Sequence, residues 1–256
     1  MGKMIAVHSY KGGTGKTLIS TNLAAALAKQ GEKVCLMDLD FRAPSLASLL
    51  GIENMKYWIN DYLNGICDVE KTIMNMSHRI AVENRFFTSL ANPSLEAIRD
   101  MSSKDRKWEM KALTKLLSLK NSLLSGGKFE YIVMDTSPGL QYSSINAIVA
   151  ADIVLVVTTM DKSDASGTRK MLRELYDIFE KKTGLILNKV MYEEPLAHEE
   201  ELQQMVKETY GVHLLAAIPC FCDIIKAYGK TIFVHEKPNH PFADIINKII
   251  IKIKEM

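Results

Sequence analysis

The sequence predicts an α/β fold: a doubly wound, mostly parallel sheet with helices on both faces. Two observations lead to this prediction. Short apolar runs without polar alternation recur along the chain, as strands buried on both faces require. Segments of helical pattern separate these runs, which favours parallel strands joined by crossover helices. The predicted strands are Met4–Val7, Lys33–Asp38, Phe129–Asp135, Ile153–Thr159, Gly184–Val190 and His213–Ile218.

The length allows one large domain or two small ones, and we predict a single domain spanning residues 1–256 because strands and helices alternate throughout the chain. Apolar residues make up 47% of the chain and charged residues 24%, enough for a sizeable core. The net charge of +2 argues neither for nor against a nucleic-acid partner. The chain has no apolar run of about 18 residues and no secretory signal, so we expect a cytoplasmic protein. Its four cysteines are then reduced thiols: Cys35, Cys67, Cys220 and Cys222.

A glycine-rich turn connects the first strand to the predicted helix Thr17–Gln30, which ends at Gly31. The turn reads Lys11-Gly12-Gly13-Thr14-Gly15-Lys16-Thr17. Its three glycines allow a tight bend that aims backbone N–H groups inward, giving an anion-binding concavity at a helix N-terminus. In this context Lys16 is expected to reach the β- and γ-phosphates of a nucleotide, and the Thr17 hydroxyl to contact Mg²⁺.

The turn departs from the standard phosphate-loop pattern, because Tyr10 stands where that pattern has glycine and Lys11 is added. With this second lysine it resembles the deviant Walker A motif of the MinD/ParA family of P-loop ATPases. The resemblance implies ATP or ADP with Mg²⁺, slow hydrolysis, and ATP joining two protomers, with each Lys11 reaching the partner's phosphates. It also implies nucleotide contacts from every residue of 11–18, Leu18 included. It is weak for residues 52–128.

Acidic residues end two of the predicted strands beside the phosphate loop, where doubly wound folds bind ligands. The resemblance implies that Asp40 lies in switch I, where it orients the attacking water and supports the metal through water. Asp38 orients the loop or supports the metal's waters. Asp135 ends a Walker B strand and is expected to hold Mg²⁺ through water, before a switch II turn at Pro138-Gly139. The alternative is that these are ordinary solvated strand-end aspartates.

The resemblance also places the adenine site. It implies that Asn188 reads the base and that Pro219, with the loop beside it, completes the pocket. Cys220 and Cys222 follow directly. They are either small apolar loop residues or, paired across two protomers, four thiolate ligands for a metal.

Residues 52–128 are expected to be mostly helical, with one or two short strands in Arg79–Leu90 and a solvated turn at Ser103–Lys107. Two further helices follow in the second half of the chain. The predicted helices of these regions are Trp58–Leu63, Val69–Met76, Ser94–Met101, Trp108–Leu124, Ser163–Lys181 and His198–Tyr210.

The last segment, Phe242–Met256, places its isoleucines on one helical face and Lys248, Lys252 and Lys254 away from it. Such a helix can cover a sheet or lie on an anionic membrane. We favour the core, because the membrane helix of the family follows its last core helix and no second helix follows here.

These observations predict an ATPase switch for cellular positioning or partitioning that acts on a protein regulator. Two alternatives stay open: a metallochaperone ATPase that uses Cys220 and Cys222, and a nucleotide-dependent scaffold for a cell-surface machine. Arg169, Lys170 and Arg173 could contact DNA, although a solvated helix face is the commoner explanation.

Overall fold

The computed structural model describes residues 2–176, 179–191, 199–227 and 229–256. Its strands form one eight-stranded sheet in the order β3-β4-β2-β5-β1-β6-β7-β8, within the described residues. Every neighbouring pair is parallel except β3 and β4. The predicted fold class is confirmed. The strands are β1 Lys3–His8, β2 Val34–Leu39, β3 Ile73–Asn75, β4 Phe86–Ser89, β5 Tyr131–Thr136, β6 Ile153–Thr158, β7 Lys182–Val190 and β8 His213–Pro219.

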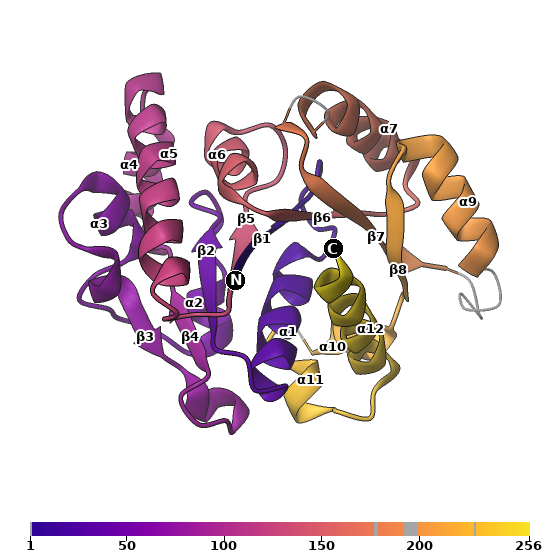
Figure 1. Ribbon diagram of the computed structural model, residues 1–256, viewed down its shortest axis with the longest axis horizontal. Helices are drawn as coiled ribbons and strands as arrows, with labels where there is room; N and C mark the ends of the chain where they lie inside the picture. Colours follow the sequence, from indigo (N-terminus) through magenta and orange to yellow (C-terminus); the bar gives the residue numbers. More distant parts are fainter. Residues whose placement is uncertain (1, 177–178, 192–198, 228) are drawn as a thin grey trace.

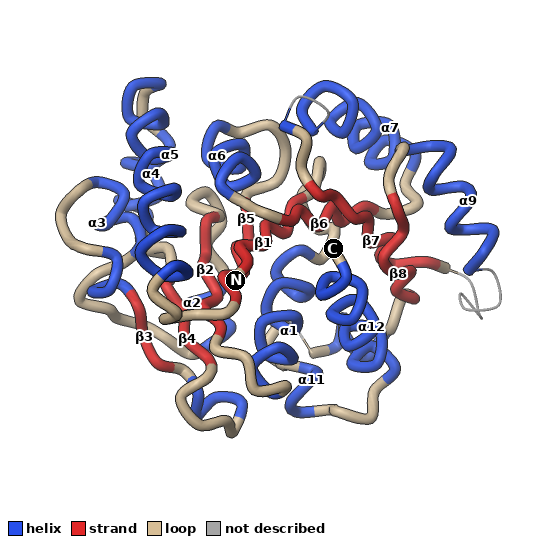
Figure 2. The backbone as a smooth tube through the Cα atoms, viewed as in Figure 1, coloured by secondary structure: helices blue, strands red, loops and turns tan. Residues whose placement is uncertain are grey.

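Helices cover both faces of the sheet, and Figure 2 shows the strands as a band between two helical layers. In the central strand β1, alternate residues enter opposite clusters: Ile5 and Val7 pack under α1 and α12, whereas Met4 and Ala6 pack under α5 and α6. In Figure 1, α1, α11 and α12 lie on one side of the sheet and α5, α6, α7 and α9 on the other. The helices are α1 Lys16–Lys29, α2 Leu46–Leu50, α3 Ile59–Asn64, α4 Leu95–Ser102, α5 Arg106–Lys120, α6 Tyr142–Ala150, α7 Lys162–Met171, α9 Glu199–Tyr210, α10 Cys222–Lys226, α11 Phe233–Glu236 and α12 Pro241–Glu255.

The central strand β1 is the point in the sheet from which later strands are added in both directions. It pairs with β5 on one side and β6 on the other. The crossover through α1 leads from β1 to β2, and the crossover through α6 leads from β5 to β6 on the opposite face. Ligands of doubly wound sheets bind at the carboxyl ends of the strands beside such a point.

The region of residues 52–128 departs most from its prediction. The expected helix Val69–Met76 is wrong: the segment forms a 3₁₀ turn, Val69–Thr72, and then the edge strand β3. The four-residue spacing of Val69 and Ile73 fits a helix, but antiparallel pairing of β3 with β4 overrides that weak local preference. The segment Arg79–Leu90 holds one strand, β4.

Smaller differences concern helix ends. The expected turn Ser103–Lys107 gives way to helix at Arg106, because the Asp105 carboxylate caps α5 by accepting from the Trp108 N–H at 2.7 Å. Helix α6 was not predicted. The expected helix Ser163–Lys181 is α7 followed by a π-helical turn, Leu172–Tyr176. Residues 177–178 of that prediction, and His198 of the helix before β8, lie outside the described residues.

The isoleucine face of α12 belongs to the core, as predicted. Ile246, Ile249, Ile250 and Ile253 are fully buried in the cluster that also contains α1. A membrane role for this helix would require that face to leave the core. Among the described residues, no helix is both long and apolar enough to cross a membrane.

Candidate functional site

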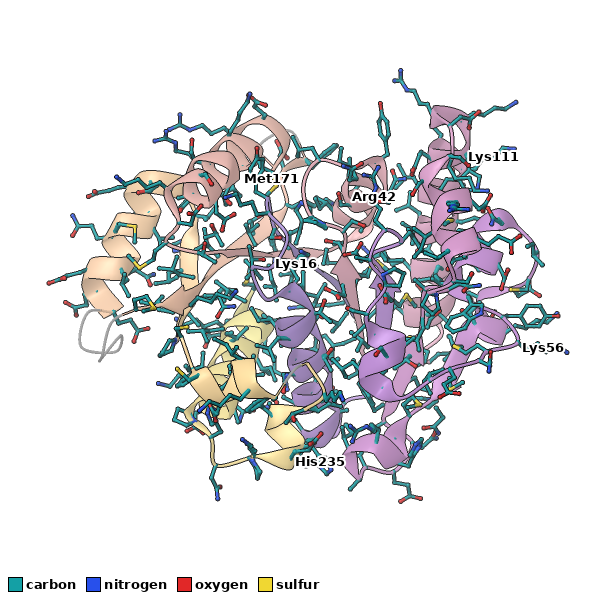
Figure 3. The ribbon with its side chains drawn as sticks, turned by 180° about the vertical axis from the view of Figure 1, so that it is seen from behind. Lys16, Arg42, Lys56, Lys111, Met171 and His235 are labelled. Carbon is teal, nitrogen blue, oxygen red and sulfur yellow. The ribbon has the colours of Figure 1, made fainter. Side chains whose placement is uncertain are left out.

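A cavity of about 540 Å³ lies where the glycine-rich turn meets the loops that follow β2, β7 and β8. Figure 3 shows Lys16 where α1 begins, near the middle of the molecule. Three residues of the predicted site, Lys11, Thr14 and Asp135, do not line the cavity itself. The predicted residues that line it are Gly12, Gly13, Gly15, Lys16, Thr17, Leu18, Asp40, Asn188 and Pro219.

The turn takes its shape from two glycines with positive φ. Gly13 has a φ of 75°, and Gly15, which precedes α1, has a φ of 104°. A side chain at Gly15 would be strained for a second reason, since its Cβ would come within 2.3 Å of the Asn188 Nδ2 atom. Gly15 therefore allows Asn188, from the far end of the cavity, to rest directly on the turn.

Lys16 is 7% exposed, and its ammonium donates to the Ser9 hydroxyl at 2.9 Å. Burial lowers the pKa of Lys16, while the nearby carboxylates, Asp135 foremost, oppose that shift. Beneath the turn, burial and the charge of Lys16 lower the pKa of His8 to about 3, which keeps its ring neutral. The site therefore holds one buried cation surrounded by carboxylates.

Thr17 and Asp135 meet at the carboxyl ends of the central strands. The Thr17 hydroxyl donates to Asp135 Oδ2 at 2.6 Å. Asp135 is 1% exposed, and its Oδ1 atom has no hydrogen-bond partner among the described residues. Burial raises the pKa of Asp135 to about 7. A hydroxyl beside a buried carboxylate with an unpartnered oxygen fits a hard divalent cation such as Mg²⁺.

The two aspartates after β2 have different surroundings. Asp38 is fully buried and accepts from the backbone N–H groups of Asp40, at 3.0 Å, and Leu46, at 3.3 Å. Burial, and secondarily the charge of Asp135, raise the pKa of Asp38. Asp38 therefore shapes the loop that carries Asp40.

Asp40 lines the cavity. Its Oδ1 atom accepts from the Ser137 hydroxyl at 3.0 Å and from the backbone N–H groups of Arg42 and Ala43 at 3.3 and 3.2 Å. Ser137 belongs to the turn after β5, so this contact joins the two loops predicted to act as switches. The position of Asp40 is thus set by both loops together.

Lys11 points away from the cavity and binds the N-terminal end of α7. Its ammonium lies 2.9 Å from the Asp161 carboxylate and also donates to the Ser163 hydroxyl. The hydrogen bond from Lys11 lowers the pKa of the exposed Asp161 carboxyl. Within one protomer, Lys11 does not contact the space where a nucleotide would lie.

Tyr10, which replaces the glycine of the standard pattern, also rests on α7. A Cβ atom at Gly167 would come within 2.0–2.4 Å of three carbons of the Tyr10 ring. The ring therefore occupies a slot that exists because residue 167 has no side chain, although Tyr10 remains 38% exposed.

The other end of the cavity is formed by Asn188, Lys189 and the segment after β8. Asn188 Nδ2 donates to the Thr14 carbonyl at 2.6 Å, and the Lys189 ammonium donates to the Gly13 carbonyl at 2.8 Å. Lys189 adopts a φ of 57°, unusual for a residue with a side chain and typical of functional sites. The remaining wall is mostly apolar and consists of Ile218, Pro219, Cys220, Phe221, Ile224 and Ile225.

Cys220 lines this wall, and Cys222 is exposed. Within the described ranges, no three His, Cys, Asp or Glu side chains gather closely enough to hold a metal ion. One protomer thus gives no support to a metal site at these cysteines.

Several residues of the site were assigned no role from sequence: Ser9, Ser137, Asp161, Gly167 and Lys189. Lys189 adjoins the predicted site residue Asn188, and Ser9 lies two residues before Lys11. Asp161 had a local signal as a helix cap after β6. Gly167 had only its unfavourable place inside a helix, and Ser137 had no distinguishing pattern.

Comparison with known proteins gives consistent results. A family model described as an AAA domain matches residues 2–191. The septum site-determining protein MinD of Thermotoga maritima is 34% identical over 230 residues, covering 89% of this chain and 79% of that protein. The structure of MinD from Pyrococcus horikoshii complexed with Mg-ADP superposes with a TM-score of 0.77 at 26% identity, covering 99% of this chain and 96% of that one. The cell division ATPase MinD of Pyrococcus furiosus gives a TM-score of 0.77 at 28% identity, covering 100% and 99%.

Proposed function

The chain belongs to the MinD/ParA family of P-loop ATPases, and on that premise we propose that it is a nucleotide switch. It binds ATP with Mg²⁺, hydrolyses ATP slowly and pairs with a second copy of itself while ATP is bound. The observation that carries the proposal is that Lys16, Thr17 and Asp40 line one cavity beside the buried Asp135. A phosphate-binding cation, a metal site and a water-orienting carboxylate would thereby come together at the carboxyl ends of the central strands.

The phosphates would lie on the turn at the start of α1. Lys16 is held by Ser9 and has no carboxylate at hydrogen-bond distance among the described contacts, so its charge remains available to the β- and γ-phosphates. Thr17 and Asp135 would hold Mg²⁺, with Asp135 acting directly or through water. When bound, the ion offsets the charge of the phosphate oxygens. The MinD of Pyrococcus horikoshii, solved with Mg-ADP, supports this choice of ligand.

Asp40 would orient the water that attacks the γ-phosphate. Its contacts with Ser137 and with two backbone N–H groups hold one carboxylate oxygen in place. Because Ser137 belongs to the other switch loop, a rearrangement of either loop on hydrolysis would also move Asp40. In this way a change from ATP to ADP would alter the conformation of the loops at the surface of the protein.

Lys11 would act between protomers. It lies outside its own cavity and pairs with Asp161 and Ser163, both exposed at the start of α7. We propose that it leaves these partners when two protomers meet and then contacts the phosphates of the other copy. The resting pair is an exposed one, so its loss should cost little.

The process under control is cellular positioning, with a protein regulator as the partner of the ATP-bound dimer. The name of the Thermotoga relative, a septum site-determining protein, supports this choice and narrows it to placement of the division site. We place this activity in the cytoplasm. The metallochaperone and scaffold alternatives have no observation in their favour.

The test separates hydrolysis from pairing. Asp40→Ala should keep ATP bound while lowering turnover by about 100-fold, so that ATP traps a dimer visible by light scattering. Lys11→Ala should bind ATP as a monomer. Lys207→Ala, which removes an exposed charge on α9, serves as the control and should behave like wild type.

Two results would contradict the proposal. Wild-type turnover in Asp40→Ala would remove Asp40 from the mechanism. An ATP-dependent dimer of normal stability in Lys11→Ala would remove Lys11 from the interface.

A further inference from the structure

We call the end of the cavity opposite the phosphate site the base end, because a nucleobase would lie there. Part of its wall is the short helix α10, which is weakly attached to the rest of the protein. Phe221, Ile224 and Ile225 line the cavity, yet none of the residues of α10 is buried. Phe221 and Ile224 are only partly covered by the core beneath them. A wall made of side chains that are only partly buried keeps its shape only if something outside the helix fixes it.

His240, which comes directly before α12, lies behind this wall. Its Nε2 atom is 2.9 Å from the Asp223 carboxylate of α10. Its ring meets the Phe221 ring edge to face, with centroids 4.8 Å apart and an interplanar angle of 74°. The opposite contact is with Phe233, whose ring centroid is 5.3 Å away. The imidazole thus lies between the cavity wall and the buried core.

The hydrogen bonds of His240 define its orientation. The Nδ1 atom accepts from the Phe242 N–H at 3.1 Å and caps α12. Nδ1 therefore carries no proton, and the hydrogen of the ring lies on Nε2, where it donates to Asp223. Because α12 is packed into the core through its isoleucine face, the imidazole is anchored to a rigid element. Asp223 has a second, longer contact, with Lys237 at 3.7 Å.

Helix capping alone does not account for this residue, because asparagine, aspartate or serine caps a helix more readily than histidine. What histidine adds is a flat ring between two aromatic side chains and a second polar atom for Asp223. Its side chain is 13% exposed, so these contacts largely exclude water.

We propose that His240 is a positioning residue for nucleotide recognition: it holds Phe221 and α10 against the cavity so that they receive the purine base. The inference rests on the proposed function, since it assumes that a nucleoside triphosphate occupies the cavity. It assigns discrimination between a nucleotide and a bare phosphate chain to residues 221–225 and to His240, which is distant from them in sequence.

The test compares ATP with tripolyphosphate, each with Mg²⁺, by calorimetric titration. His240→Asn retains an oxygen that can cap α12 but removes the ring. It should bind ATP about tenfold more weakly and tripolyphosphate as wild type does, because one aromatic contact to a base is worth about that factor. Phe221→Ala should show the same pattern. The double variant should be no weaker than the weaker single variant, since His240 acts through Phe221.

Asp223 provides a matched pair of variants. Asp223→Asn keeps an oxygen that accepts from Nε2 and should retain wild-type ATP affinity, whereas Asp223→Ala should lose several-fold. Unchanged ATP affinity in His240→Asn, or equal losses for ATP and tripolyphosphate, would overturn the inference. If the wild-type protein binds tripolyphosphate and ATP but these variants do not discriminate, the proposed function still stands. If the wild type binds neither ligand, both fail.

Discussion

At one end of the cavity, Lys16, Asp38 and Asp135 are buried and linked by hydrogen bonds to loops and strand ends. At the other end, Phe221, Ile224 and Ile225 are partly or largely exposed and touch the ligand space through apolar atoms. The first end is a fixed arrangement of charges, which suits any polyphosphate. The second is a surface whose shape depends on support from α12. Affinity should therefore come mainly from the phosphate end, and selectivity from the base end.

The largest expected effect lies at the phosphate end. Lys16→Ala removes a buried cation aimed at the phosphates, so affinity for ATP and for tripolyphosphate should both fall by about 100-fold or more in a titration. Lys29→Ala, at the exposed far end of the same helix, is the matched control and should leave both affinities unchanged. If the Lys16 variant lost affinity for ATP alone, the division between the two ends would be wrong.

The next effect in size is on the free energy of unfolding, which the buried Asp135 carboxylate lowers when no cation or nucleotide is bound. Because burial raises the pKa of Asp135 to about 7, the folded chain retains a proton that the unfolded chain releases near pH 4. The folded state thus binds more protons between these values, so the free energy of unfolding from this group falls as the pH rises from about 4 to about 7. Without Mg²⁺ and nucleotide, Asp135→Asn should remove this contribution and stabilise the protein at pH 8 by an amount on the order of a few kcal/mol.

The measurement is denaturant unfolding of both proteins across that pH range. Ile225→Ser at the base end is the comparison. It should change stability by no more than about 0.5 kcal/mol at any of these pH values, because Ile225 is largely exposed. The informative quantity is the difference in unfolding free energy between wild type and Asp135→Asn, because the lowered pKa of His8, about 3, gives the wild type an opposite slope over much of the same range. A difference that does not change between pH 4 and pH 8 would show that the Asp135 carboxyl is already ionised at low pH.

The smallest effect concerns Asn188, which belongs to both ends. Its amide already donates one hydrogen to the Thr14 carbonyl and its oxygen accepts from the Lys189 N–H, leaving one hydrogen and one lone pair for a base. Asn188→Ala should therefore weaken ATP binding about tenfold and tripolyphosphate binding only a few-fold. Equal losses would mean that Asn188 supports the turn and does not read adenine.

The same contrast explains what could be predicted from the sequence. The fold class and the turn at residues 11–17 were predictable because strand, turn and helix are local and their residue types have direct physical meaning. Asp40 and Asp135 were found as acids at strand ends. Their roles in catalysis and metal binding stay predictions.

The base end was less accessible to sequence analysis, because His240, Asp223 and Phe221 meet only through tertiary packing and no local pattern links them. Likewise, β3 was read as helix because the spacing of its apolar residues is ambiguous over so short a segment. Pairing with β4 makes this segment a strand, and the β4 residues with which it pairs lie more than ten residues further along the chain.

The slot at Gly167 has a consequence for how this family can diverge. A glycine inside a helix lowers its stability by about 1 kcal/mol relative to alanine, yet alanine here would collide with the Tyr10 ring. With any side chain at residue 167, the Tyr10 ring would have to turn away from α7, so a bulky residue at position 10 packs best where residue 167 is glycine. A chain with glycine at position 10 has no ring there and leaves space for a larger residue on α7. Across related sequences the two positions should be inherited as a pair, with the identity of one forecasting the size of the other.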